Sequence, residues 1–374
     1  MYRKGCRCLF GSSRGACPPR FAIFQRRIFM TNTAVIGYGY AGRAFHSYLV
    51  SLADGLNLYA IATRDAERRG AAREAYPNAQ IYQTLDEVLA DDAVELVVLA
   101  TPHDTHAELA IKAMDAGKHL VTDKIMAMNT AEADAMIAAS QRNNVMLSVF
   151  HNRRWDWDYL TVKKVIADGL LGTPYLFQVA IMRYGKPGGW RSIKKHSGGI
   201  LYDWPAHFVD QALQFVQAPV ASIFCDIHYN AKWDVDIGNY ANLIIKFKND
   251  VRYQIEIGNL SKAEKPRWYV VGDEGGLVKY GLDPQEGPMR DGDIDAAEED
   301  PGNYAKVWTE AGGEPRELVI ESVRGTWKSY YHNIADVLNN GAELVVKPEE
   351  VRKVMQVYDA AMQSAETGET VSFR

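Results

Sequence analysis

A glycine-rich turn set between an apolar run and a helix-forming segment constrains the fold of this chain more than any other feature. The stretch Ala34–Phe45 reads AVIGYGYAGRAF and spaces three glycines as Gly-x-Gly-x-x-Gly. Gly37 permits a tight turn, Gly39 lets a pyrophosphate approach the backbone, and Gly42 allows the helix to pack close to the sheet. The alternative is a glycine-rich turn that binds no ligand, but the strand before it and the helix after it favour a dinucleotide site. We therefore expect a dinucleotide to bind at Gly37, Gly39, Tyr40, Ala41 and Gly42.

The segment before this fingerprint has a different character. Residues 1–29 carry seven Arg or Lys, no acidic residue, and three of the four cysteines. They show neither helical nor strand periodicity, and no apolar stretch of signal-peptide length. We predict that residues 1–29 are a disordered tail or a mis-assigned start, and that the first domain begins at Met30.

The composition is that of an ordinary globular protein, with 47% hydrophobic and 24% charged residues in a chain of 374. The net charge of −5 disfavours a nucleic-acid partner, and no apolar run has the length that spans a membrane. Cys225 is the one cysteine after residue 29, which fits a cytoplasmic protein without disulfides. A chain of this length has room for two domains, each with its own core.

Apolar, β-rich runs alternate with helical segments between residues 30 and 150. The runs lie at 34–37, 56–63, 94–101, 119–123 and 145–150. The helical segments between them lie at 42–52, 65–75, 105–116 and 130–143. Strands buried on both faces read as continuous apolar runs, so this alternation predicts an α/β domain of the Rossmann type, with a doubly wound parallel sheet.

The pattern changes over residues 151–374. A helix at 159–168 precedes longer strands at 174–184, 221–230, 240–248 and 251–259, and the chain closes with helices at 329–339 and 347–365. The turn at 248–250 predicts a hairpin, and the acidic stretch 287–302 predicts an exposed loop. We expect an α+β domain with a large, mostly antiparallel open sheet. It would bind substrate and join subunits into a homodimer or homotetramer.

The end of the second strand bears on the choice of cofactor. In this type of domain an acidic residue about twenty positions past the glycines usually binds the adenosine ribose, but this chain has Thr63 and Arg64 there. A hydroxyl and a guanidinium suit a 2′-phosphate, whereas Asp65 fits the N-cap of the next helix. The pattern favours NADP over NAD, unless Arg64 is only a solvated surface residue.

Three further stretches follow strand ends or glycine turns: Thr101-Pro102 with His106, Asp123-Lys124, and residues 197–211, which read SGGILYDWPAHFVDQ. Together with the glycine fingerprint, in this order, they resemble the Gfo/Idh/MocA family. The resemblance runs from about Met30 to the closing ETGETVSF segment. The stretch NRRWD at 152–156 is most similar to the branch of NADP-dependent scyllo-inositol dehydrogenases.

The resemblance implies a nicotinamide-dependent dehydrogenase that acts on a secondary alcohol of a sugar or cyclitol. The family's strand-end lysine corresponds to Lys124, and its Asp-x-x-x-His pair corresponds to Asp203 and His207. The family usually reads Glu-Lys-Pro at the lysine, whereas this chain reads Asp-Lys-Ile. Because Ile125 lacks the fixed φ and the cis preference of proline, we expect Lys124 to project somewhat differently.

The spacing of Asp203 and His207 suits proton transfer. Pro205 fits a first helical turn, so Asp203 is expected at or next to the N-cap, with His207 on the same face one turn later. The helix dipole favours neutral imidazole and Asp203 opposes it, so we expect His207 to titrate near neutral pH. We assign His207 as proton acceptor, Lys124 as hydrogen-bond donor to the reacting oxygen, and Asp203 as orienter. The alternatives are a plain helix cap at Asp203 and a core histidine at His207.

The remaining candidate residues are expected to contact the nicotinamide or the substrate. The set expected near the nicotinamide is Thr101, Pro102, His106, Asp123 and Lys124. Polyols are often held by bidentate donors and aromatic faces, so the candidate substrate contacts are Arg153, Trp155, Tyr184, Trp190 and Arg191. His103 and His106 alone do not make a metal site, and we expect no metal. The role of His151 stays open.

Two other functions compete with the dehydrogenase. One is a redox-neutral glycosidase with bound nicotinamide, which would co-purify with cofactor and give no net NADPH. The other is a non-catalytic NADP-sensing regulator. A sensor has no need of Lys124, Asp203 and His207 together, which argues against the regulator.

Overall fold

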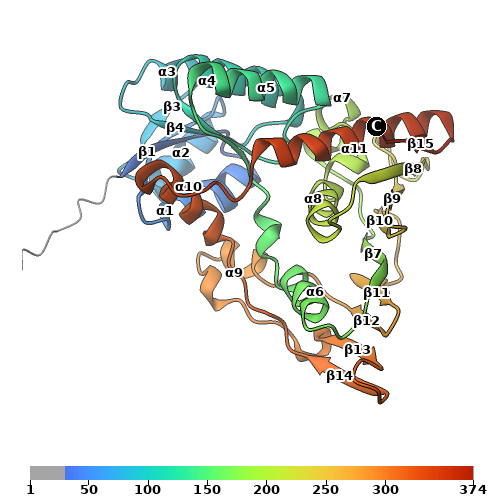
Figure 1. Cartoon of the computed structure of the whole chain (residues 1–374). Coiled ribbons are helices and arrows are strands. Elements are labelled where there is room, and N and C mark those ends of the chain that lie inside the picture. The colour runs from blue at the N-terminus through green and yellow to red at the C-terminus, as the bar shows by residue number, and fades with distance from the viewer. Residues whose placement is uncertain (1–29, 374) are drawn as a thin grey trace, which may run out of the picture.

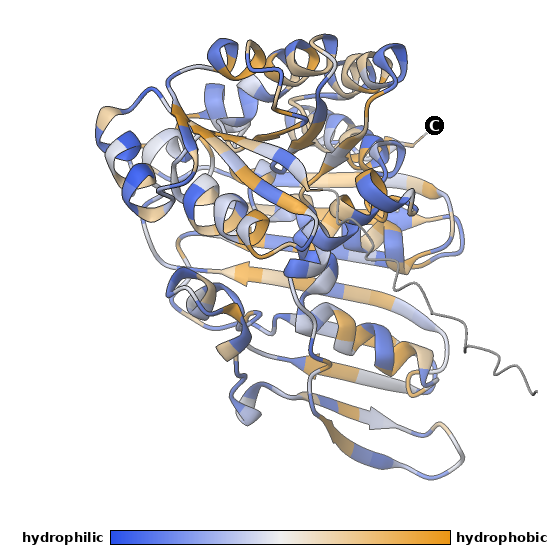
Figure 2. Cartoon of the chain, turned by 90° about the vertical axis from the view of Figure 1, so that its left-hand side faces the viewer, coloured by the Kyte–Doolittle hydropathy of each residue, from blue (hydrophilic) through white to orange (hydrophobic). Residues whose placement is uncertain are grey.

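The computed structural model describes residues 30–373, which form two halves with one sheet each (Figure 1). Residues 1–29, predicted as a tail or mis-assigned start, lie outside the described residues. Apolar residues, orange in Figure 2, concentrate along the strands, and the main buried cluster draws on both halves. The fold class predicted from the sequence is confirmed.

The first half contains a six-stranded parallel sheet in the order β3-β2-β1-β4-β5-β6. Its strands are β1 (Thr31–Ile36), β2 (Leu56–Ala62), β3 (Gln80–Tyr82), β4 (Leu96–Leu99), β5 (His119–Thr122) and β6 (Leu147–Val149). β4 is buried along its whole length, as expected of a strand with helices on both faces. The strand order reverses between β1 and β4, which is where open sheets of this kind bind ligands.

Helical segments connect these strands: η1 (Ala41–Ser47, a π-helical segment), α1 (Tyr48–Ser51), α2 (Ala66–Ala75), α3 (Leu85–Leu89), η2 (His103–Thr105), α4 (His106–Asp115) and α5 (Thr130–Asn143). Asp65 caps α2 as predicted, because its Oδ1 accepts a hydrogen bond from the backbone N–H of Arg68 at 3.1 Å. The sequence pattern missed β3 and α3. These elements span three and five residues, which is too short for a period to show.

The second half contains a nine-stranded sheet in the order β14-β13-β12-β11-β7-β10-β9-β8-β15. Its strands are β7 (Pro174–Met182), β8 (Val220–His228), β9 (Tyr240–Phe247), β10 (Arg252–Gly258), β11 (Trp268–Gly272), β12 (Gly275–Lys279), β13 (Ala305–Thr309), β14 (Arg316–Ile320) and β15 (Val371–Ser372). Only the β7–β10 pairing is parallel. The predicted hairpin joins β9 to β10, with Asp250 at a φ of +63° in its turn.

The acidic stretch 287–302 differs from the exposed loop predicted for it. It contains most of α9 (Glu286–Arg290), together with η6 (Ile294–Ala296) and part of η7 (Pro301–Asn303). The side chains of Met289 and Ile294 are buried. These apolar anchors hold the segment against the body of the protein, so it contains short helices where a loop was predicted, while most of its residues are exposed as expected.

The other helices of the second half are η3 (Asn152–Trp155), α6 (Trp157–Ala167), η4 (Gly189–Ser192), α7 (Lys194–Ser197), η5 (Ile200–Tyr202), α8 (Pro205–Phe215), α10 (Lys328–Asn340) and α11 (Pro348–Thr367). Helix α10 returns to the first half and packs against α1 and β1 (Figure 1). Thr31 donates a hydrogen bond to Asn339 at 3.0 Å, and His46 contacts the hydroxyl of Tyr331 at 2.6 Å. The last part of the chain therefore completes the packing of the first half.

Candidate active site

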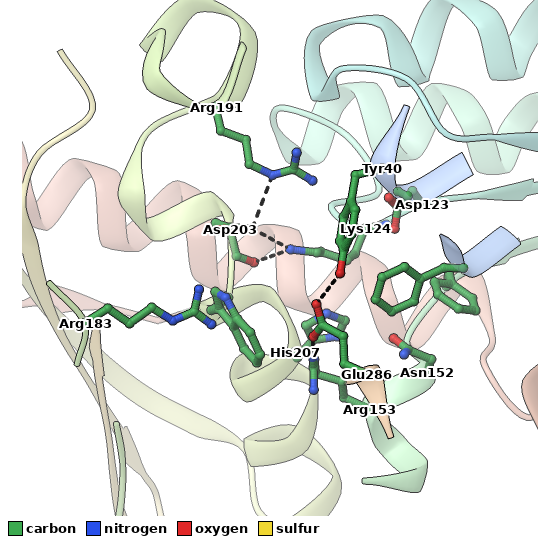
Figure 3. A pocket seen from close by; sticks show the side chains of 14 residues that line it. Tyr40, Asp123, Lys124, Asn152, Arg153, Arg183, Arg191, Asp203, His207 and Glu286 are labelled. Carbon is green, nitrogen blue, oxygen red and sulfur yellow. Dashed lines mark hydrogen bonds and ion pairs between the residues drawn. The ribbon is translucent and has the colours of Figure 1, made fainter. Parts of the chain in front are cut away.

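A cavity of about 340 Å³ opens where the two halves meet, beside the switch point of the parallel sheet. Its walls come from the turn after β1, the ends of β5, β6 and β7, the start of α8, and α9 (Figure 3). The three residues predicted as catalytic, Lys124, Asp203 and His207, all line it. Sequence positions that are almost 80 residues apart are thus brought to one site.

Lys124 and Asp203 form an ion pair on the wall of this cavity. The Nζ of Lys124 donates to Oδ1 of Asp203 at 2.8 Å and to its main-chain carbonyl oxygen at 2.9 Å. The Lys124 side chain is 14% exposed, so it is held from one side and open to the cavity on the other. Asp203 immediately precedes Trp204, the N-cap of α8, as its predicted place at or next to the cap requires.

His106 contacts the backbone of the segment that follows β5. The Lys124–Ile125 peptide bond is cis, although residue 125 is not proline. Ile125 is buried, and its carbonyl oxygen lies 2.7 Å from Nδ1 of His106. The other ring nitrogen of His106 lies 3.0 Å from the carbonyl oxygen of Thr101. His106 is fully buried and begins α4, so it positions the ends of β4 and β5.

Burial and nearby charges keep Asp203 ionised and His207 neutral. Burial raises the pKa of Asp203, but the charges of Lys124 and Arg191 outweigh it and hold that pKa below its ordinary value. Burial lowers the pKa of His207 well below 6.5, and Lys124 and Arg153 lower it further. The prediction that His207 titrates near neutral pH is therefore wrong. Asp203 was expected to counter the helix dipole, yet it is paired with Lys124 instead.

A buried polar network lies behind His207. The ring of His151 meets that of His207 edge to face, with centroids 5.6 Å apart. Nδ1 of His151 is 3.9 Å from Asp210, whose carboxylate accepts two hydrogen bonds from Arg154, at 2.6 and 2.8 Å. Burial is the main reason that the pKa of His151 falls to about 4. The wall behind His207 thus contains a second neutral imidazole.

A chain of contacts from Tyr40 to Trp204 closes the opposite wall. The hydroxyl of Tyr40, in the glycine turn, donates to Glu286 of α9 at 2.6 Å. Glu286 also pairs with Arg153 at 3.4 Å, and Arg153 is anchored by Asp156 at 3.0 Å. The guanidinium of Arg153 lies over the ring of Trp204, 4.0 Å from its centroid. Figure 3 shows Tyr40, Glu286 and Arg153 on this side of the cavity.

The turn after β1 has the form that a dinucleotide requires. Gly37 has a φ of +97°, and a Cβ there would lie 2.3 Å from the carbonyl oxygen of Ala100. A Cβ at Gly42 would lie 1.9 Å from the carbonyl oxygen of Gly37. A Cβ at Gly39 would meet only a guanidinium nitrogen of Arg68, at 3.6 Å, so the space above Gly39 is open. The residues therefore fit a bound pyrophosphate.

A second cavity, of about 370 Å³, extends from Gly39 towards α2. Arg43 and Arg68 line it, and the sequence argument named neither. Thr63 is buried, and its hydroxyl faces the backbone N–H of Asp65 at 3.4 Å. Arg64 is exposed and does not line this cavity. The cations that line this cavity are thus Arg43 and Arg68 rather than Arg64.

The predicted substrate contacts divide into two groups. Arg153 and Arg191 line the first cavity. Tyr184 lies outside it, in a neighbouring cavity. Trp155 packs its ring edgewise on Tyr330, with centroids 6.3 Å apart, and lines none of these cavities, so its prediction as a substrate contact is not supported by its position.

Trp190 and the β4 end lie next to the site rather than in it. The ring of Trp190 meets His103 edge to face at 4.7 Å, and Arg191 covers it, 4.5 Å from its centroid. Thr101 accepts a hydrogen bond from Thr105 at 2.8 Å, and Pro102 is the N-cap of η2. These residues shape the segments that carry the cavity wall.

Sequence reasoning missed several cavity residues: Phe45, Phe150, Asn152, Arg183, Trp204 and Glu286. Trp204 and Asn152 lie within the stretches 197–211 and 152–156. Their position beside predicted site residues was the signal that could have identified them. Arg183 directly follows β7, and Glu286 lies in α9. No local pattern marks these two, because their place depends on the contact between the two halves.

Acidification is expected to destabilise the fold through its buried histidines. Burial lowers the pKa of His103 to about 3 and that of His151 to about 4, and it lowers the pKa of His207 well below its ordinary value. An unfolded histidine titrates near 6.5, so below that pH each of these three side chains binds more protons in the unfolded chain than in the native one. The free energy of unfolding should then fall as the pH drops from 7 to 5. Urea titrations at pH 7, 6 and 5 measure this, and an unchanged midpoint would contradict it.

No helix within residues 30–373 is both long and apolar enough to cross a lipid bilayer. Within the same range, no group of three or more His, Cys, Asp and Glu side chains is arranged to hold a metal ion.

Both halves match known protein families. Residues 31–151 match the family described as the oxidoreductase family with an NAD-binding Rossmann fold. Residues 159–278 match the GFO/IDH/MocA C-terminal domain.

Relatives of known sequence and structure span nearly the whole chain. The Bacillus subtilis scyllo-inositol 2-dehydrogenase (NADP(+)) IolW is 31% identical over 353 residues, which cover 93% of this chain and 97% of that protein. The uncharacterized oxidoreductase YdgJ of Escherichia coli is 33% identical, with coverage of 88% and 95%. A solved structure of the oxidoreductase yvaA from Bacillus subtilis superposes with a TM-score of 0.86 at 30% identity, covering 94% of this chain and all of that one.

Proposed function

This chain belongs to the Gfo/Idh/MocA family of oxidoreductases, and we propose that it transfers a hydride between NADP and a secondary alcohol of a sugar or cyclitol. The observation that carries the proposal is one cavity that holds Lys124, Asp203 and His207 beside the glycine turn. Alcohol oxidation needs a proton acceptor and a hydrogen-bond donor next to the dinucleotide. This cavity offers both.

His207, Lys124 and Asp203 have different roles in the proposed reaction. His207 is neutral at pH 7 because burial and nearby cations depress its pKa, so it is ready to accept the hydroxyl proton of the alcohol. Lys124 donates to the reacting oxygen and stabilises its developing negative charge. Asp203 holds the ammonium group of Lys124 through two contacts, which makes it a positioning residue. The bound nicotinamide would accept the hydride.

We propose NADP as the preferred cofactor. The chain has no acid at the usual ribose position, where Thr63 and Arg64 stand. Arg43 and Arg68 line the cavity next to the glycine turn and offer guanidinium groups to a phosphate. The relative IolW is named as an NADP(+) enzyme, which supports the same choice.

The Arg68→Ala variant is expected to raise KM for NADP about 10–100-fold, which is the loss of one charge-assisted hydrogen bond. KM for NAD should change little, because NAD has no 2′-phosphate. Arg73→Ala removes an equivalent charge from the exposed last turn of the same helix and serves as the control. Equal effects of Arg68→Ala on both cofactors would contradict a 2′-phosphate contact.

The reaction is tested by following reduced-nicotinamide absorbance with NADP or NAD against a panel of inositols, aldoses and anhydrosugars. Steady NADPH formation with at least one alcohol supports the dehydrogenase. The redox-neutral glycosidase would instead cleave a glycoside with bound cofactor and no net NADPH. A regulator would bind NADP without turnover of any compound.

The organisation of the chain around this function is also a proposal. We place the dinucleotide-binding domain at 30–150 and the substrate and oligomerisation domain at 151–374, in a cytoplasmic protein. Tyr269, Trp308 and Val319 are exposed on the outer face of the nine-stranded sheet. Exposed apolar side chains on a sheet favour a homodimer or homotetramer, which light scattering measures.

A further inference from the structure

A neighbouring cavity of about 350 Å³ lies on the far side of Asp203 from the glycine turn. It shares four wall residues with the catalytic cavity: Arg183, Arg191, Asp203 and Trp204. Two of the four are arginines. A molecule that reacts at Lys124 and His207 therefore has room to extend past these arginines into a second space.

The positive charge on the shared wall is not matched by nearby carboxylates. The guanidinium of Arg183 lies over the ring of Trp204, 4.6 Å from its centroid, and among residues 30–373 it forms no ion pair or side-chain hydrogen bond. Arg191 lies 3.9 Å from Asp203, but that carboxylate is already bound by Lys124 at 2.8 Å. Asp203 thus pairs with both Lys124 and Arg191.

The catalytic cavity has two other carboxylates, Asp123 and Glu286, and Asp123 lies 3.7 Å from His46. Glu286 accepts the hydroxyl of Tyr40 and pairs with Arg153, on the wall away from Arg191 (Figure 3). Burial and the charges of Arg153 and Arg267 lower the pKa of Arg183, against the opposing pull of Asp203 and Glu286. Asp203 is accordingly the carboxylate that Arg183 and Arg191 share, and Lys124 already binds it.

The rest of the neighbouring cavity is mostly apolar. Its walls include the isoleucines Ile181, Ile200, Ile237 and Ile257, and the exposed ring of Tyr184 at its rim. Such walls suit the C–H faces of a sugar ring or a short carbon chain. They do not by themselves offer a counter-ion for the two arginines.

Resting on the proposed function, we infer that the substrate carries an anionic substituent, a carboxylate or a phosphate ester, which binds between Arg183 and Arg191. The reacting hydroxyl then lies at Lys124 and His207, and the part of the molecule bearing the anion enters the neighbouring cavity. Guanidinium groups bind both anions by paired hydrogen bonds. A neutral inositol would fill the catalytic cavity and leave the two arginines without a partner.

Calorimetry measures the affinity of the protein for two anionic probes, glucuronate and glucose 6-phosphate, and for neutral glucose. NADPH is present throughout, so that the glycine turn is filled and no alcohol is oxidised. We expect at least one acid to bind about 10–100-fold more tightly than glucose. Tighter binding of glucuronate would indicate a carboxylate site, and tighter binding of glucose 6-phosphate would indicate a phosphate site.

Matched variants assign the preference to the shared wall. Arg183→Met keeps an unbranched side chain against Trp204 and removes the charge, so the ratio of acid to glucose affinity should fall towards one. Arg183→Lys should retain part of it. Lys248→Met removes a charge from the exposed turn between β9 and β10 and should leave the ratio unchanged.

Two results would overturn the inference: equal binding of acids and glucose by the unchanged protein, or a preference that survives both Arg183→Met and Arg191→Met. Failure of the proposed function looks different. In that case no alcohol in the panel gives NADPH, while the binding ratio still responds to Arg183→Met.

Discussion

His207→Ala is expected to lower kcat for alcohol oxidation by about 10²–10⁴-fold, the usual contribution of a general base. His207 lines the same cavity as Lys124, is neutral at physiological pH, and lies at the start of α8 where a substrate hydroxyl can reach it. KM should change less than kcat, because the lost interaction is with a proton in transfer. Initial rates at saturating NADP and alcohol measure the effect.

The control for this variant is His196→Ala, which removes an imidazole that pairs with Asp104 at 2.7 Å outside the cavity. His207 is buried, so thermal unfolding must show that His207→Ala still folds. His207→Gln keeps more of the volume and should be equally impaired. Unchanged turnover of His207→Ala on every alcohol would remove His207 from the mechanism.

Lys124→Met is expected to lower kcat by about 10²–10³-fold, as the loss of one donor to a developing oxyanion does. It should also change the pH dependence. Lys124 is the largest cause, after burial, of the low pKa of His207. Without that charge the pKa of His207 rises towards 6.5, so the acid limb of the rate profile moves to higher pH. Profiles of kcat/KM between pH 5 and 9 measure both effects.

Lys164→Met is the matched control, since Lys164 pairs with Asp168 on an exposed face of α6. It should change neither kcat nor the pH profile. A Lys124→Met protein that loses rate with an unmoved acid limb would show that the charge of Lys124 does not act on His207. An unimpaired Lys124→Met protein would exclude the donor role altogether.

Local patterns in the sequence were sufficient for most of the fold. The buried strands of the first half are continuous apolar runs, and the β9–β10 hairpin has a turn that favours a positive φ at Asp250. Strands β11–β14 were missed, because they are five residues each and separated by glycines or acidic segments. Short strands take their place from neighbours in the sheet rather than from their own period.

The candidate site was predictable only in part, for a physical reason. Lys124 and His207 follow a strand end and a helix start, which are local features. Arg183 and Glu286 reach the cavity because the two halves meet there, and this contact has no signature in either segment. The pKa of His207 depends on burial and on the approach of Lys124 and Arg153, so helix-dipole reasoning alone gave the wrong value.

The return of α10 to the first half has a consequence for how the protein is made. The hydrogen bond between Thr31 and Asn339 joins residues 308 positions apart. At a synthesis rate of about 5–20 residues per second, α10 leaves the ribosome roughly 15–60 s after β1. Throughout that interval Phe45 lacks Trp327, on which it stacks at 5.6 Å, and His46 lacks Tyr331. The nascent first half therefore stays incomplete at this face until the last part of the chain has been made.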